Sequence, residues 1–174
     1  MTVVTRFDTL TSALLAQRES SARIGVISEH GEMDAWSYEE LRERACGFLA
    51  YLQTSGVERG DELVIAYRSM TSIMTAYWAA LFGGLVPVPL SAPNSDRDLE
   101  KLYNIWNVLP HPWLAIDDEA VLEADVGYCT DLRGHAVTPG AATGFPAVDE
   151  AGSWACSSQR HSLSPWRHMT RNSP

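Results

Sequence analysis

The sequence predicts an α/β fold, a parallel or mixed sheet flanked by helices, and three consecutive patterns carry that prediction. Residues 63–67 form an unbroken apolar run behind the turn Gly60-Asp61, which is typical of a strand buried on both faces. Residues 70–82 then change to a helical period, and Gly83-Gly84 end that helix. Residues 86–90 form a second strand, so the three pieces make a right-handed βαβ unit.

The second strand of this unit is expected at an edge of the sheet. Pro87 and Pro89 are two residues apart, so both missing N–H groups point to the same side. Val88 and Leu90 can still pair on the other side. The preceding helix is expected to have a broad face of large apolar residues and an opposite face of residues small enough to lie against a sheet. The small residues are Thr71, Thr75, Ala76 and Ala79.

The amino-terminal part of the chain predicts a helix and a hairpin. An amphipathic helix is expected over residues 8–19, with one side formed by Leu10, Ala13, Leu14 and Gln17. Residues 23–28 and 33–36 are expected to form two short strands joined by a turn at His30-Gly31-Glu32.

Ser37 predicts the start of a second helix. It is a good N-cap, and Glu40 three residues later completes a capping box. The helix ends at Ser55-Gly56, and Glu39 and Arg42 form a pair on its solvated side. Its buried face is expected to contain Tyr38, Leu41, Ala45, Phe48, Leu49 and Leu52, with Cys46 as a small packing residue at the flank.

Further helix and strand signals follow the βαβ unit. Ser95 caps a helix with an acidic first turn, which Pro110 and Pro112 stop. Its buried face is expected to contain Leu99, Leu102, Trp106 and Leu109. Residues 113–116 predict a third parallel strand. Beyond it we expect an acidic helix at 118–124, a short strand at 129–132 and a loop without its own core at 134–150.

Composition restricts the class of protein. With 174 residues and 45% hydrophobic content, the chain can bury a core, and its net charge of −9 argues against nucleic acid as a partner. Three cysteines without metal or redox spacing fit a reducing cytosol, so a cytoplasmic location is expected. No signal peptide is visible. The most apolar stretch, residues 73–90, reads as helix plus strand rather than a membrane span.

The last 24 residues differ from the rest. All 22 acidic residues lie at or before Glu150, whereas residues 151–174 hold three arginines, two histidines and no hydrophobic period. We therefore expect one unit at residues 1–150 and an aberrant, disordered tail at residues 151–174.

No catalytic, cofactor-binding or metal-binding residue is predicted. Residues 138–146 have some character of a phosphate loop, but their glycines are four apart and no lysine follows, which favours a plain connection. For Asp117-Asp118-Glu119 a solvated helix start is favoured over a cation site. The histidines share no metal spacing; they are His30, His111, His135, His161 and His168. Four tryptophans are expected to fill the core rather than stack on a ligand, namely Trp36, Trp78, Trp106 and Trp113.

Three motifs resemble the amino-terminal part of the adenylate-forming superfamily, which includes acyl-CoA synthetases, fatty acyl-AMP ligases and the adenylation domains of nonribosomal peptide synthetases. Residues 36–41 (WSYEEL) resemble its early (Thr/Ser)-Tyr-x-Glu-Leu motif. Residues 56–64 (GVERGDELV) resemble its turn into a strand. Residues 80–90 (ALFGGLVPVPL) resemble its Ala-Gly-x-x-x-Val-Pro segment, with Gly83 where the family usually has Ala. Residues 90–93 and 101–106 make the fatty acyl-AMP ligase branch the most similar one.

The resemblance implies a ligase that activates a carboxylic acid as its adenylate, with ATP and Mg²⁺, and passes the acyl group to a carrier-protein or coenzyme A thiol. The family's phosphate loop, ending in Pro-Lys-Gly, and its catalytic lysine have no counterpart in these 174 residues. We therefore expect a truncated, inactive product, and the composition of residues 151–174 suggests a shifted reading frame. The alternative is a non-catalytic module, either a split half or a docking piece for a carrier protein.

Overall fold

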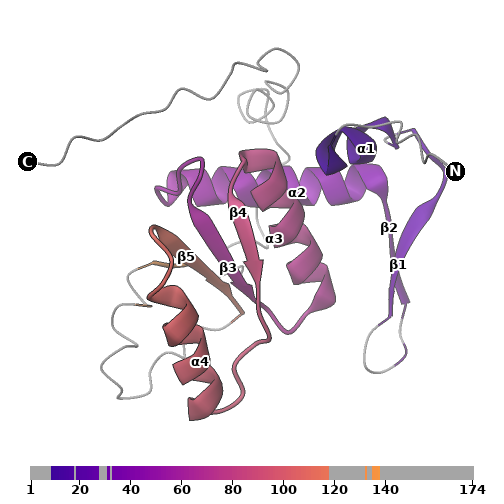
Figure 1. The fold of residues 1–174 in the computed structure, drawn as a ribbon. Helices are drawn as coiled ribbons and strands as arrows, with labels where there is room; N and C mark the ends of the chain where they lie inside the picture. The colour runs from indigo at the N-terminus through magenta and orange to yellow at the C-terminus, as the bar shows by residue number, and fades with distance from the viewer. Residues whose placement is uncertain are drawn as a thin grey trace, which may run out of the picture.

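A computed structural model of the chain describes residues 9–17, 19–27, 31, 33–117, 132 and 135–137. Figure 1 shows the helices and strands that confirm the predicted α/β class. In chain order they are α1 (Leu10–Ala16), β1 (Arg23–Ile27), β2 (Met33–Ser37), α2 (Tyr38–Thr54), β3 (Glu62–Ala66), α3 (Met70–Gly83), β4 (Val86–Pro89), α4 (Asp96–Trp106), β5 (Pro112–Ile116) and β6 (Ala136–Val137).

The main sheet has the strand order β4-β3-β5-β6, and every neighbouring pair is parallel. Val64 of β3 lies opposite Val88 of β4 on one side and Leu114 of β5 on the other. Strands β1 and β2 pair antiparallel in a separate two-stranded sheet, as the hairpin prediction required.

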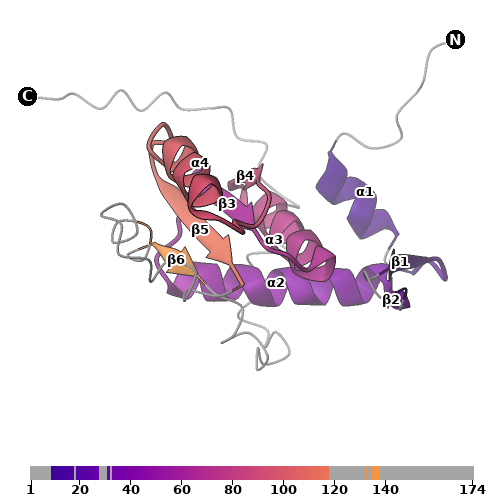
Figure 2. The same ribbon diagram turned by 90° about the horizontal axis from the view of Figure 1, so that it is seen from below.

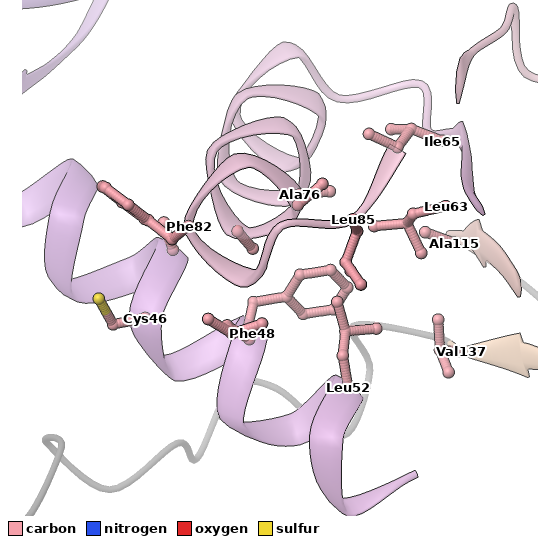
Figure 3. Close-up of a cluster of buried hydrophobic side chains, with 14 of the residues drawn as sticks. Cys46, Phe48, Leu52, Leu63, Ile65, Ala76, Phe82, Leu85, Ala115 and Val137 are labelled. Atoms are coloured by element: carbon pink, nitrogen blue, oxygen red, sulfur yellow. The ribbon is translucent and has the colours of Figure 1, made fainter. Parts of the chain in front are cut away.

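Strand β3 is buried on both faces because helices cover the sheet from two sides. Leu63 and Ile65 belong to a cluster with α2 and α3, whereas Val64 and Ala66 belong to a cluster with α4. Figure 2 shows α4 on one side of β3 and β5, with α3 and α2 on the other. Figure 3 shows the first cluster, where side chains from α2, α3 and the sheet point toward one another. This packing explains the unbroken apolar run in β3.

The predicted small face of α3 is confirmed in part. Ala76 and Ala79 are fully buried in one cluster with Leu63 and Ile65 of β3, whereas Thr71 and Thr75 are partly buried. The helix ends at Gly84, which has φ +67° and so needs a residue without a Cβ. Gly83 lies close to α2, because a Cβ at this position would stand 2.5 Å from Leu49 Cδ1.

Strand β4 is the edge that its prolines predicted. Val86 N–H donates to Asp61 O and Leu90 N–H donates to Ile65 O, both at 2.9 Å. Pro87 and Pro89 alternate with these donors and have no N–H group of their own. Among the described strands, β4 pairs only with β3.

The capping box of α2 is confirmed in both directions. The Glu40 N–H donates to Ser37 Oγ at 3.1 Å, and the Ser37 N–H donates to Glu40 Oε2 at 2.6 Å. The predicted pair of Glu39 and Arg42 also forms, with 2.6 Å between Oε1 and Nη2. The buried face agrees with the prediction except that Tyr38 is only partly buried and Cys46 and Gly47 are buried too.

Helix α4 and strand β5 also follow their signals. Ser95 Oγ accepts from the Asp98 N–H, and Leu99, Leu102 and Trp106 are buried while Leu109 is partly buried. Strand β5 includes Pro112, one residue before the predicted start, and pairs parallel with β3.

Two predictions were wrong in detail. Helix α1 is shorter than residues 8–19, and Leu10 is 59% exposed because the cap at Thr9 turns Thr11 and Leu14 to the core instead. Strand β6 lies in the segment 134–150 that was predicted to be a loop. A two-residue strand is too short to show a period of two in the sequence.

Several predictions fall outside the described residues. These are the acidic helix at 118–124, residues 129–131 of the predicted strand, most of the loop at 134–150 and the tail at 151–174. The predicted boundary between residues 1–150 and the tail also falls there. Leu132 is buried in the α4 cluster. In the part of the chain that is described, no helix is long and apolar enough to cross a membrane.

Candidate functional site

The carboxyl edge of the parallel sheet is the place where a ligand site is expected in an open α/β fold. After β3 the chain continues to β4 on one side, and the strand after β5 lies on the opposite side. The strand order therefore reverses between β3 and β5. In such sheets, ligands bind outside the carboxyl ends of the two strands at this reversal.

Asp117 joins the carboxyl ends of β3 and β5. The Arg68 N–H, just beyond β3, donates to Asp117 Oδ2 at 2.5 Å across 49 residues of sequence. This bond gives the Asp117 carboxylate a backbone partner. Residues 118 and 119 of the predicted acidic run lie outside the described part.

The amino end of α3 adds hydroxyl groups to the same edge. Ser69 caps the helix, its Oγ accepting from the Ser72 N–H at 3.4 Å and lying 2.6 Å from Thr71 Oγ1. The first turn has no acidic residue. The described residues of this edge therefore present hydroxyls, N–H donors and the Arg68 side chain, but no pair of nucleophile and base.

Tyr67 is the residue at this edge that sequence reasoning missed as a possible site residue. Its side chain is 3% exposed, and its hydroxyl has no hydrogen-bond partner among the described groups. Burial, and then the charge of Asp117, raise the pKa of Tyr67 well above its usual value, so the phenol stays neutral and cannot serve as a base. Its position directly after a parallel strand was the available signal.

The acidic residues at the opposite, amino edge serve the fold. Asp61 Oδ2 accepts from Trp113 Nε1 at 3.1 Å and from the Glu58 N–H at 2.8 Å. Glu62 Oε2 accepts from the His111 N–H at 2.9 Å. These carboxylates connect the turn before β3 to β5, so their hydrogen bonds account for them without a ligand.

Among the described residues, the candidate site residues considered from the sequence do not come together into one site. Residues 138–146, His30, His161 and His168 lie outside the described part. His111 and His135 belong to no group of three metal-ligating side chains among the described residues.

The tryptophans and Cys46 are packing residues, as expected. Trp36 and Trp106 are buried, and Trp78 and Trp113 are partly buried against the core. Cys46 is buried in the cluster that α2 and α3 form with the sheet.

The chain belongs to the family of AMP-binding enzymes, whose family profile matches residues 15–105. Among curated proteins, the uncharacterized acyl-CoA ligase YtcI of Bacillus subtilis (strain 168) is 33% identical over 72 residues. That match covers 41% of this chain and 14% of YtcI, so the chain spans about one seventh of the length of this relative.

Solved structures agree with the fold. A structure of McyG A-PCP complexed with phenylalanyl-adenylate has a TM-score of 0.72 and 23% identity, covering 85% of this chain and 28% of its own. The fatty acid AMP ligase from Legionella pneumophila has a TM-score of 0.65 and 16% identity, covering 83% and 26%. The expected likeness to the amino-terminal subdomain of adenylate-forming enzymes is confirmed at the level of the fold.

The three family motifs lie at structural joints. Residues 36–41 end β2 and cap α2, residues 56–64 form the turn into β3, and residues 80–90 cover the end of α3 and all of β4. Each motif fixes how an element begins or ends. The motifs that this chain shares with the family thus coincide with the ends of helices and strands.

Proposed function

We propose that this chain is part of the scaffold of a ligase that converts a carboxylic acid to its acyl-adenylate with ATP and Mg²⁺. The acyl group then passes to the thiol of a carrier protein or of coenzyme A. The observation that carries the proposal is the AMP-binding family match over residues 15–105, together with three motifs placed at the joints of β2, β3 and β4.

The descriptions of the relatives support a proposal for the substrate class. YtcI is described as an acyl-CoA ligase, the Legionella pneumophila protein as a fatty acid AMP ligase, and the McyG structure contains phenylalanyl-adenylate. We propose a fatty acid or an amino acid as substrate, a carrier protein as a partner in nonribosomal peptide or polyketide biosynthesis, and the cytoplasm as the location. The A-PCP description of McyG supports the carrier.

The 174 residues alone are proposed to be inactive. Their sequence contains a single lysine, Lys101, and no Pro-Lys-Gly. The Lys101 Nζ lies 2.9 Å from Asp98 Oδ1 on α4, and the pair lowers the pKa of Asp98. Lys101 thus forms an ion pair on the surface of α4. The groups that bind a nucleotide would come from outside the described residues.

An ATP–pyrophosphate exchange assay tests this proposal. The purified chain is incubated with ATP, Mg²⁺ and panels of fatty acids and amino acids, with an intact member of the family as the positive control. We expect no exchange above the blank. Turnover that depends on the added acid would overturn the proposed inactivity and would confirm the proposed chemistry.

A second candidate is a non-catalytic module, either a split half of a ligase or a docking piece for a carrier protein. Two exposed apolar side chains that pair across the β1–β2 hairpin, Ile27 and Met33, favour it. Pull-down of a stable complementary chain would support the split half, whereas capture of a carrier protein alone would support the docking piece.

A further inference from the structure

We draw no further inference here: the strongest candidate, the hydroxyl of Tyr67 at the carboxyl edge of the sheet, is buried without a hydrogen-bond partner among the described residues, and nothing in that part of the chain shows what would bind it.

Discussion

Gly83 lies where α3 comes closest to α2, and this contact makes a prediction at the scale of one residue. A Cβ at Gly83 would stand 2.5 Å from Cδ1 of the buried Leu49. Overpacking of this kind costs about 1–3 kcal/mol. Alanine recovers up to about 1 kcal/mol of helix propensity. We therefore expect Gly83→Ala to lower the free energy of unfolding by about 1 kcal/mol, measured by urea denaturation.

The control for this variant is Gly25→Ala, whose added Cβ would meet only Met33 atoms at 3.6 Å or more, an ordinary contact. It should be near neutral. Adding Leu49→Val to Gly83→Ala should recover part of the loss, because it removes the methyl group in the way. A Gly83→Ala variant as stable as the wild type would contradict the close approach of α2 and α3.

Tyr67 gives the second prediction at this scale. Its buried hydroxyl has no hydrogen-bond partner among the described residues, so removing it removes a desolvation cost. Tyr67→Phe should be neutral or should stabilise the chain by up to about 1 kcal/mol in urea denaturation. Tyr67→Ala, the control for packing, should cost about 3–5 kcal/mol. A loss above about 1 kcal/mol for Tyr67→Phe would reveal a partner for the hydroxyl.

The capping box of α2 makes a prediction at the scale of an element. Its bond from the Ser37 N–H, and next the Ser37 hydroxyl, lower the pKa of Glu40 from its usual 4.5. A carboxyl whose pKa is lower in the folded state stabilises that state above its unfolded pKa, and this stabilisation disappears as pH falls through the folded pKa. The stability contributed by Glu40 should therefore be complete at neutral pH and lost in acid.

Glu40→Gln measures this contribution. Its free energy of unfolding is compared with that of the wild type from about pH 7 to about pH 3. The wild type should be more stable at neutral pH, and the difference should shrink as pH falls below 4.5. Ser37→Ala, which removes the other half of the box, should cost about 1 kcal/mol at neutral pH. A difference between wild type and Glu40→Gln that does not change with pH would contradict the role of the charge.

At the same scale, the sequence predicted elements well wherever a local signal set both ends. Helix α2 begins at the capping box of Ser37 and Glu40, and α4 begins at its N-cap Ser95. Helix α3 ends at Gly84, which adopts the left-handed conformation of a C-cap. The exposure of Leu10 and the presence of β6 were not predicted, because no local signal sets them. The side that a seven-residue helix buries and the pairing of a two-residue strand depend on tertiary contacts, which leave little local trace.

At the scale of the whole molecule, the described residues of both hydrophobic clusters lie between Leu14 and Val137. The composition of residues 151–174, without a hydrophobic period, predicts that deleting them leaves the midpoint of thermal unfolding unchanged. Differential scanning calorimetry of the two chains measures this. A clear drop would show that the tail contributes to the folded unit and would refute the predicted boundary.

The site was less predictable than the fold at this scale. Sequence motifs predicted where several helices and strands begin or end. The hydrogen bond between Arg68 and Asp117 links residues 49 positions apart, and it could be predicted only if the strand order were known. The sequence predicted β4 at an edge beside β3, but it contains no sign that β5 is the other neighbour of β3. The exposed pair of Ile27 and Met33 likewise depends on a register that periodicity alone leaves open.

The two prolines of β4 have a consequence for how this sheet can grow. Fibrils and strand-swapped assemblies extend by adding N–H···O=C bonds along a free edge, and the outward side of β4 lacks the donors of positions 87 and 89. Without these two donors, addition of a strand to that edge of the described sheet loses the N–H···O=C bonds of positions 87 and 89. The prolines thus protect the β4 edge from strand addition by covalent chemistry.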